Sequence, residues 1–111
     1  MTTTAKNIVP RKDAEGAQAT QYTATNCRTI IDKFTATNHT AGNVTIAVSL
    51  VPSGGAAAAA NTVLAARAIA PGETYLCPEL IGQILEAGGF ISTLAGAAAS
   101  LSISASGREV V

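Results

Sequence analysis

The sequence predicts an all-β fold: a single β-sandwich, immunoglobulin-like or jelly-roll-like, with about six to eight short antiparallel strands. Short segments rich in Val, Ile and Thr alternate apolar with polar residues, the pattern of a strand with one buried face. Turn-forming residues separate these segments at intervals of about ten residues. With 111 residues, the chain has room for one modest core.

The beginning of the chain differs in composition from the rest. Residues 1–16 are polar and mixed in charge, and the β-type pattern starts only after them. We therefore expect an N-terminal arm at residues 1–16 and a β-sandwich domain at residues 17–111. Ile8, Val9 and Pro10 are the apolar part of the arm, which makes them the candidate partner-binding residues. Whether the arm orders on a neighbouring protein or is a disordered leader stays open at this point.

The clearest strand is NVTIAVSLVP at residues 43–52, where branched apolar residues alternate with smaller ones. The segment at 28–38 also alternates, but it places Asp32 on the same side as Ile30 and Phe34, so a bulge or an edge position is expected there. A short turn cluster joins these two segments, which predicts a β-hairpin. The full set of expected strands is 17–25, 28–38, 43–52, 62–70, 73–76, 90–96 and 99–111.

The stretch APGETYLCPELIGQILEAGGFI, residues 70–91, contains three of the seven acidic residues and one of the two cysteines. We interpret it as a structural joint of the sandwich and not as an active site. Pro78 favours the first position of a helix, and one short helical turn is predicted near residues 78–85. Four apolar residues of this turn are expected to plug one end of the sandwich. They are Leu80, Ile81, Ile84 and Leu85. The Ala-rich segment at 53–61 is expected to be a loop with at most one helical turn.

The composition excludes several classes of partner. Seven basic and seven acidic residues give a formal net charge of zero, and 13% of the residues are charged. A basic face for a row of phosphates is not expected, so no nucleic-acid partner is predicted. The apolar stretches are too short and too often interrupted to span a bilayer, so no membrane partner is predicted. The N-terminus lacks the apolar region of a secretory signal, which indicates a product made in the cytoplasm.

The residues capable of chemistry are sparse and form no motif. Cys27 and Cys77 lack a metal-ligand spacing; two buried free thiols are the favoured interpretation, and a disulfide is the alternative. His39 lies in a polar turn, and nothing places it beside a cysteine with an orienting third group. The frames of a nucleophile elbow, a phosphate-binding loop and a calcium loop are absent. We therefore predict no catalytic residue, no metal site and no cofactor, and a protein that is not an enzyme.

Four pieces of the chain carry a likeness to a known family. They are residues 43–52, the turn Pro71-Gly72-Glu73, Leu85 with Gly88-Gly89, and the closing Ser106-Gly107-Arg108-Glu109. Over roughly residues 20–110, the order of these pieces resembles the small β-sandwich virion proteins of tailed bacteriophages. The pieces preserve a fold and contain no chemical signature, so the resemblance brings no catalytic residues.

The resemblance implies a non-enzymatic virion structural protein, most simply a capsid decoration (cement) protein that binds and stabilises the head shell. Its expected partners are other copies of itself, as a homotrimer, and a major capsid protein or another virion protein. Its expected location is the virion, after synthesis in the host cytoplasm. Two alternatives stay open: a neck, collar or tail adaptor or fibre base, and a carbohydrate-binding or adhesive β-sandwich. The absence of Trp and the scarcity of Tyr and Asp count against the carbohydrate-binding alternative.

Overall fold

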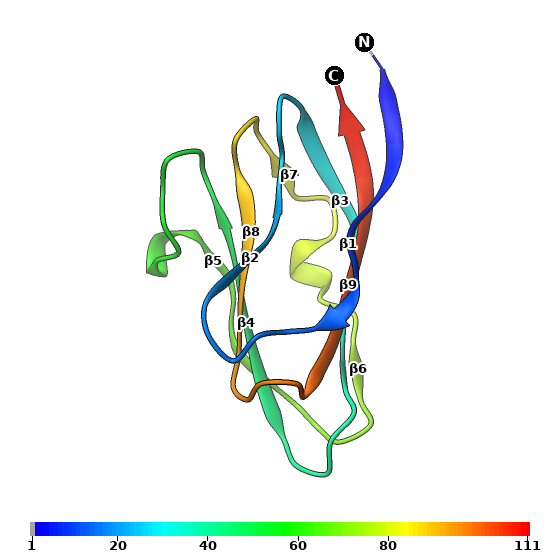
Figure 1. Ribbon diagram of the computed structural model, residues 1–111, viewed down its shortest axis with the longest axis vertical. Coiled ribbons are helices and arrows are strands. Elements are labelled where there is room, and N and C mark those ends of the chain that lie inside the picture. The colour runs from blue at the N-terminus through cyan, green and yellow to red at the C-terminus, as the bar shows by residue number, and fades with distance from the viewer. Residues whose placement is uncertain (1) are drawn as a thin grey trace.

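A computed structural model describes residues 2–111, and its regular elements are almost all β-strands (Figure 1). The strands are β1 (Thr3–Asp13), β2 (Ala19–Thr23), β3 (Arg28–Asn38), β4 (Val44–Val51), β5 (Thr62–Ile69), β6 (Thr74–Tyr75), β7 (Ile84–Leu85), β8 (Phe90–Ala95) and β9 (Leu101–Val110). Two single turns of 3-10 helix, η1 (Ala59–Asn61) and η2 (Pro78–Leu80), lie in the connections. Every predicted strand segment contains a strand, and the Ala-rich segment is a loop with one helical turn. β1 and β7 are the strands that the sequence pattern did not predict.

The strands form two antiparallel sheets that pack face to face (Figure 1). The first sheet has the order β1-β9-β3-β6, and β7 pairs with β3 on the same side as β6. The second sheet has the order β2-β8-β4-β5. In Figure 1 the first sheet lies on the right and the second on the left, and the two chain termini lie together at one end. The all-β sandwich predicted from the sequence is confirmed.

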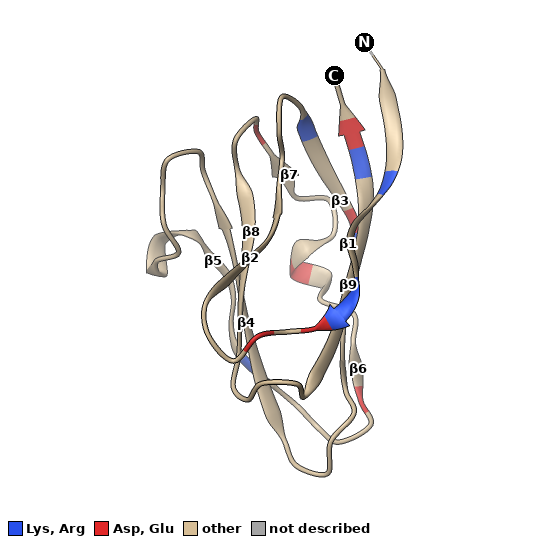
Figure 2. Ribbon diagram, viewed as in Figure 1, with Lys and Arg blue, Asp and Glu red and all other residues tan. Residues whose placement is uncertain are grey.

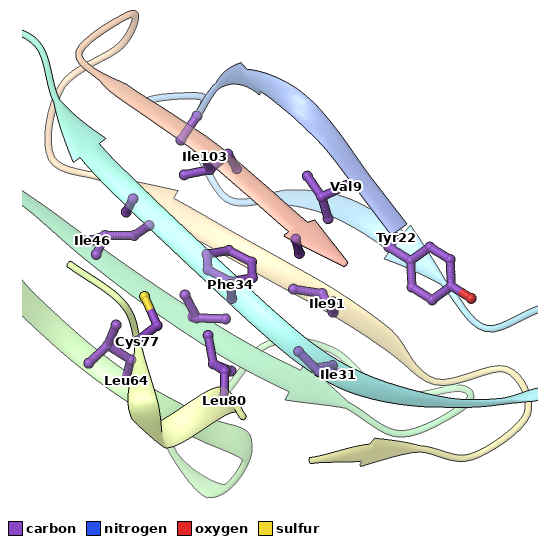
Figure 3. Close-up of a cluster of buried hydrophobic side chains, with 14 of the residues drawn as sticks. Val9, Tyr22, Ile31, Phe34, Ile46, Leu64, Cys77, Leu80, Ile91 and Ile103 are labelled. Atoms are coloured by element: carbon purple, nitrogen blue, oxygen red, sulfur yellow. The ribbon is translucent and has the colours of Figure 1, made fainter. Parts of the chain in front are cut away.

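The core lies between the two sheets and contains the inward-facing residues of both (Figure 3). Phe34 and Ile103 come from the first sheet, Ile46 and Ile91 come from the second, and all four are fully buried. In β9 the apolar residues face this core and the serines between them face away, as the alternation predicts. Removing such side chains from water, at roughly 25 cal/mol per Å² of apolar surface, is the main force that holds the sheets together.

A β-bulge in β3 accommodates Asp32. The pairing of β3 with β9 shifts register between Ile31 and Lys33. Because of the extra residue, Ile31 and Phe34 both face the core while Asp32 faces outward. Arg108 donates to the Asp32 carboxylate from Nε to Oδ2 at 3.0 Å and from Nη2 to Oδ1 at 2.9 Å. Of the two positions expected for this residue, the structure shows the bulge.

The predicted β-hairpin between residues 28–38 and 43–52 is wrong, because the chain changes sheets at this turn. β3 belongs to the first sheet and β4 to the second. The buried side chain of Asn38 fixes the corner, since its Nδ2 donates to the carbonyl oxygens of Gly42 at 2.7 Å and Ile69 at 2.8 Å. The neighbours of β3 and β4 are instead strands from the end of the chain, β9 and β8.

The structure also differs from the expected division into an arm, residues 1–16, and a domain, residues 17–111. Residue 1 lies outside the described residues, but Thr3–Asp13 form β1, which pairs with β9 along one edge of the first sheet. Ile8 and Val9 face the core. Two register shifts interrupt the pairing of β1, so its apolar residues do not alternate regularly and the sequence pattern does not reveal a strand.

The stretch at residues 70–91 connects the sheets, running from β5 in the second sheet through β6, η2 and β7 to β8. The predicted helical turn is present, but it ends at Leu80. Gly82 has a φ of 84°, and its N–H donates to the carbonyl oxygen of Ile31 at 2.7 Å, so the chain turns toward β3. η2 contacts both β3 and β5. It therefore fills the opening along one side of the sandwich and not, as predicted, at one end.

Candidate functional site

The three predicted partner-binding residues lie in β1, but in different environments. Ile8 and Val9 expose 3% and 0% of their surface and belong to the core of their own chain. Pro10 is exposed on the outer strand of the first sheet. Of the three, Pro10 is therefore the residue that can touch a partner without unfolding of the sandwich.

Large apolar side chains that remain exposed are concentrated between β6 and β7. Leu76, Ile81 and Ile84 expose 55%, 51% and 51% of their surface. We call these three residues the apolar strip. Elsewhere in residues 2–111, the exposed large apolar residues are Leu94 on β8 and Val111 at the chain end.

The apolar strip follows the edge of the first sheet that lies opposite β1. β6 pairs with the end of β3, where Tyr75 lies opposite Ala36. β7 pairs with the beginning of β3, where Ile84 lies opposite Ile30. A hollow of about 410 Å³ adjoins Ile84 and continues toward Pro52 at the end of β4. Large apolar side chains exposed at intervals along one sheet edge are candidates for a protein–protein contact.

Two of the four residues predicted to plug the sandwich belong to this strip instead. Leu80 and Leu85 are buried, as predicted. Ile81 and Ile84 are exposed because the chain leaves the helical turn at Gly82 and pairs with β3. Gly82 is the signal that sequence reasoning overlooked, since a glycine inside a helical pattern often marks its end.

A polar cluster adjoins the strip, between β5, β6 and η2. The hydroxyl of Tyr75 donates to the carboxylate of Glu79, with 2.8 Å to each oxygen. The guanidinium of Arg67 lies 4.3 Å from the centre of the Tyr75 ring. The hydrogen bond from Tyr75 lowers the pKa of Glu79, which keeps this carboxylate charged and fixed at the surface. Tyr and Arg beside exposed apolar residues are typical of the central residues of protein interfaces.

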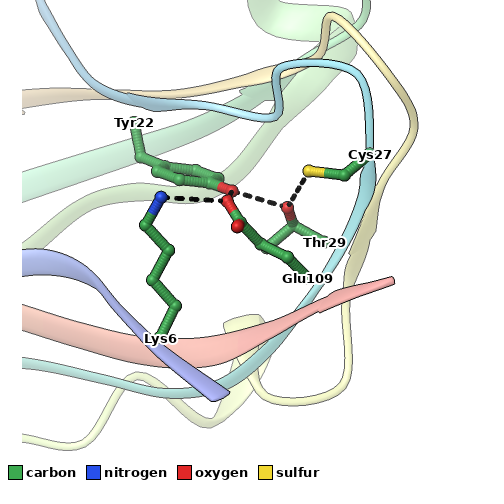
Figure 4. A network of polar contacts seen from close by, with 5 residues as sticks. All are labelled: Lys6, Tyr22, Cys27, Thr29 and Glu109. Atoms are coloured by element: carbon green, nitrogen blue, oxygen red, sulfur yellow. Dashed lines mark hydrogen bonds and ion pairs between the residues drawn. The ribbon is translucent and has the colours of Figure 1, made fainter. Parts of the chain in front are cut away.

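A second polar network joins the two sheets near the chain termini (Figure 4). Tyr22 of β2 reaches the first sheet, where its hydroxyl donates to the Glu109 carboxylate and lies 2.7 Å from Oγ1 of Thr29. Lys6 of β1 forms an ion pair with Glu109 at 3.2 Å and lies over the Tyr22 ring. The hydrogen bond from Tyr22 lowers the pKa of Glu109, and burial raises the pKa of Tyr22. The network fixes β1, β2, β3 and β9 to one another, so its role is structural.

The residues considered for nucleophilic chemistry are not assembled into a site. Cys27 and Cys77 are free and buried, as the favoured interpretation predicts. Burial raises the pKa of Cys77 to about 12, so its thiol is protonated at neutral pH. His39 is exposed at the other end of β3 from Cys27, and its Nε2 lies 2.9 Å from the Asp13 carboxylate.

Two further properties of residues 2–111 bear on function. In this range, no group of three or more His, Cys, Asp and Glu side chains is placed to hold a metal ion. The described helical turns also include none with the length and apolar character that a membrane crossing needs. The apolar strip and its polar cluster form the candidate functional site.

Comparisons of the chain with protein-family models, with curated proteins and with solved structures find no match.

Proposed function

We propose that the chain is a non-enzymatic structural protein of a bacteriophage virion, a capsid decoration (cement) protein that binds the head shell as a homo-oligomer. The observation that carries the proposal is the apolar strip, because exposed Leu and Ile side chains gathered on one edge of a small domain favour burial against another protein. The resemblance to small β-sandwich virion proteins suggests the kind of assembly.

The distribution of charge supports a role in close packing of subunits. The chain is neutral, and Lys and Arg form four ion pairs with carboxylates within residues 2–111. Charges that are neutralised inside one copy produce little long-range repulsion between copies. Such a surface tolerates the high local concentration of a repeating shell.

The attachment of the strip to the first sheet supports the same role. β6 and β7 pair with β3, and backbone hydrogen bonds join Ile31 to Gly82 and Gln83, so the backbone beside all three strip residues is fixed before any partner binds. Preorganised side chains lose little conformational freedom on binding, so more of the contact energy appears as affinity. A cement protein of this kind acts by joining neighbouring subunits and needs no chemical step.

The proposal is tested by counting copies of the chain in purified virions separated into heads and tails, with quantitative mass spectrometry. A copy number comparable to that of the major shell protein, found with heads, is the expected result. A small multiple of six or twelve found with the neck or tail would instead identify an adaptor or fibre base. Absence from both fractions would contradict the virion role itself.

The strip is tested by adding purified chain to particles that lack it. Leu76→Asp and Ile84→Asp are expected to weaken attachment, because each places a charge where apolar contact forms. Leu94→Asp is the matched control, since Leu94 is also exposed but lies on β8 in the second sheet. Equal effects of all three substitutions would show that the strip has no special role in attachment.

A further inference from the structure

We infer that the apolar strip of one copy receives the β1 edge of a second copy, so that copies associate head to tail along the first sheet. The inference rests on the proposed function in taking the chain to work as an assembly of copies. It identifies which two surfaces meet. Three features of the first sheet support it: the register of its strands, the charges left unpaired on its two edges, and the direction of its edge strands.

The register of the first sheet places matching surfaces at the same height on its opposite edges. Lys12 of β1 lies opposite Ile103 of β9, Ile103 lies opposite Ala36 of β3, and Ala36 lies opposite Tyr75 of β6. A line across the sheet therefore leads from Lys12 to the polar cluster at Tyr75. A copy displaced sideways by one sheet width brings the C-terminal half of its β1 beside that cluster.

The charges at this height are complementary. Arg11, next to Lys12, is exposed and is in none of the four ion pairs that Lys and Arg form with carboxylates within residues 2–111. On the opposite edge, Glu79 is also in none of them; Tyr75 donates to its carboxylate, and Arg67 lies over the Tyr75 ring. Figure 2 shows the basic end of β1 and the acidic residue of η2 at similar heights along the long axis. Head-to-tail contact thus gives each of these two charges a partner of opposite sign.

Apolar residues on the two edges also face each other, at the height of Arg11 and at a second height closer to the chain termini. Pro10 precedes Arg11 and is exposed, and Leu76 follows Tyr75 and is exposed, so the two meet when Arg11 meets Glu79. Toward the chain termini, a second line across the sheet runs through Ala5, Arg108, Ile30 and Ile84 in that order. Ile84 of one copy therefore faces the small side chain of Ala5 in the next, which permits close approach.

The strand directions are compatible with this contact. Each neighbouring pair in the first sheet is antiparallel, so β6 and β7 run opposite to β1. A second copy placed sideways in the same orientation therefore sets its β1 antiparallel to the strands it meets. Pro10 has no N–H to donate, so the contact at its level depends on side chains and not on a continuous ladder.

A two-fold contact of the strip with itself is the competing arrangement, and it is disfavoured by charge. Such a contact leaves the exposed Arg11 of both copies without a partner on the far edge. The head-to-tail arrangement brings Arg11 to a carboxylate, and it produces a ring where the rotation between copies closes and a filament where it does not.

Charge reversal in the purified full chain tests the inference, with sedimentation velocity from micromolar to near-millimolar concentration. The unaltered chain is expected to associate. Arg11→Glu and Glu79→Lys are each expected to weaken association by about tenfold, and the double variant to recover most of the loss. Lys33→Glu is the control, because Lys33 is also outside the four ion pairs but lies on the central strand β3.

Three outcomes would overturn the inference. A chain that stays monomeric throughout has no such contact. Association that falls with Leu76→Asp but does not respond to Arg11→Glu would show that the strip meets something other than β1. Failure of the double variant to recover, with both single variants folded by circular dichroism, would show that Arg11 and Glu79 do not face each other. None of these results bears on the copy number in virions, so the proposed function is tested separately.

Discussion

The two long sides of the sandwich are closed in different ways. On the β1–β2 side, Ile8 and Val9 complete the core, and Tyr22 ties the second sheet to the first. On the opposite side, η2 places Leu80 in the opening between the sheets but leaves the apolar strip exposed. One side is thus completed within the chain, while the other offers apolar surface for a partner. Substitutions in the exposed apolar strip are therefore expected to change assembly and hardly affect folding, whereas substitutions of the buried Ile8, Val9 and Leu80 are expected to change folding.

Deletion of residues 2–13 is the strongest test of whether the β1–β2 side is closed by the chain itself. If β1 closes the sandwich, its removal uncovers β9 and the core around Ile103, and we expect the loss of about 5 kcal/mol or more. A domain of this size has little more stability than that, so the truncated chain should be unfolded or aggregated. Thermal unfolding followed by circular dichroism measures this. A truncated chain that melts at the same temperature as the full chain would show that residues 2–13 are a dispensable arm.

Leu76 and Leu80, which lie four residues apart, test whether the side closed by η2 keeps exposed apolar surface. Leu80→Ala is expected to lower the free energy of unfolding by about 2–5 kcal/mol, because Leu80 is fully buried. Leu76→Ala is expected to lower it by about 0.5 kcal/mol or less, because Leu76 is 55% exposed. Urea denaturation of the two variants measures the difference. Similar losses from both substitutions would mean that Leu76 packs within its own chain and is not free for a partner.

The hydroxyl of Tyr22 tests how firmly the β1–β2 side is fastened. Tyr22→Phe keeps the ring but removes the hydrogen bond to Glu109 and the contact with Thr29. We expect a loss of about 1–3 kcal/mol in the free energy of unfolding, because a carboxylate and a buried hydroxyl lose a partner. Urea denaturation measures the loss. Tyr75→Phe is the matched control on the exposed side, and there the loss should be smaller; the reverse order would contradict the assignment of the closed side.

The sequence predicted the parts of the fold that local alternation determines. The regular pattern of β9 identified its buried face, and the pattern of β4 did so as far as Val48, after which Ser49 is buried and Leu50 only half-buried. The awkward position of Asp32 indicated the bulge. Bulges hid β1, because they interrupt the alternation by which a strand is recognised. The corner at Asn38 was mistaken for a hairpin because its deciding hydrogen bond reaches Ile69, far along the chain.

The candidate site was harder to predict than the fold. Whether an apolar residue is exposed depends on contacts that the local pattern does not contain. For this reason Ile81 and Ile84 were expected to plug one end of the sandwich, and Ile8 and Val9 were expected to bind a partner. Gly82 was the available clue for the strip. The network of Tyr22 and Glu109 had no clue, because these residues are 87 positions apart and meet only when both sheets have formed.

The smallest expected effect concerns the charge of Glu109 and appears as a dependence on pH. The hydrogen bond from Tyr22 holds the pKa of Glu109 below its ordinary value of 4.5 in the folded chain. A carboxyl group of this kind stabilises the fold above its unfolded pKa, and the contribution is lost as the pH falls through the folded pKa. Glu109→Gln removes the titrating group, so its cost should be largest near neutral pH and should shrink below about pH 4. Urea denaturation of the unaltered chain and of Glu109→Gln across this pH range measures that cost. Glu15 and Glu79, whose pKa values are also lowered, titrate in both chains, so their contributions cancel in the difference. A cost that stays constant with pH would show that the network holds β1 by shape and hydrogen bonding alone, and that the charge of Glu109 adds nothing to the closed side.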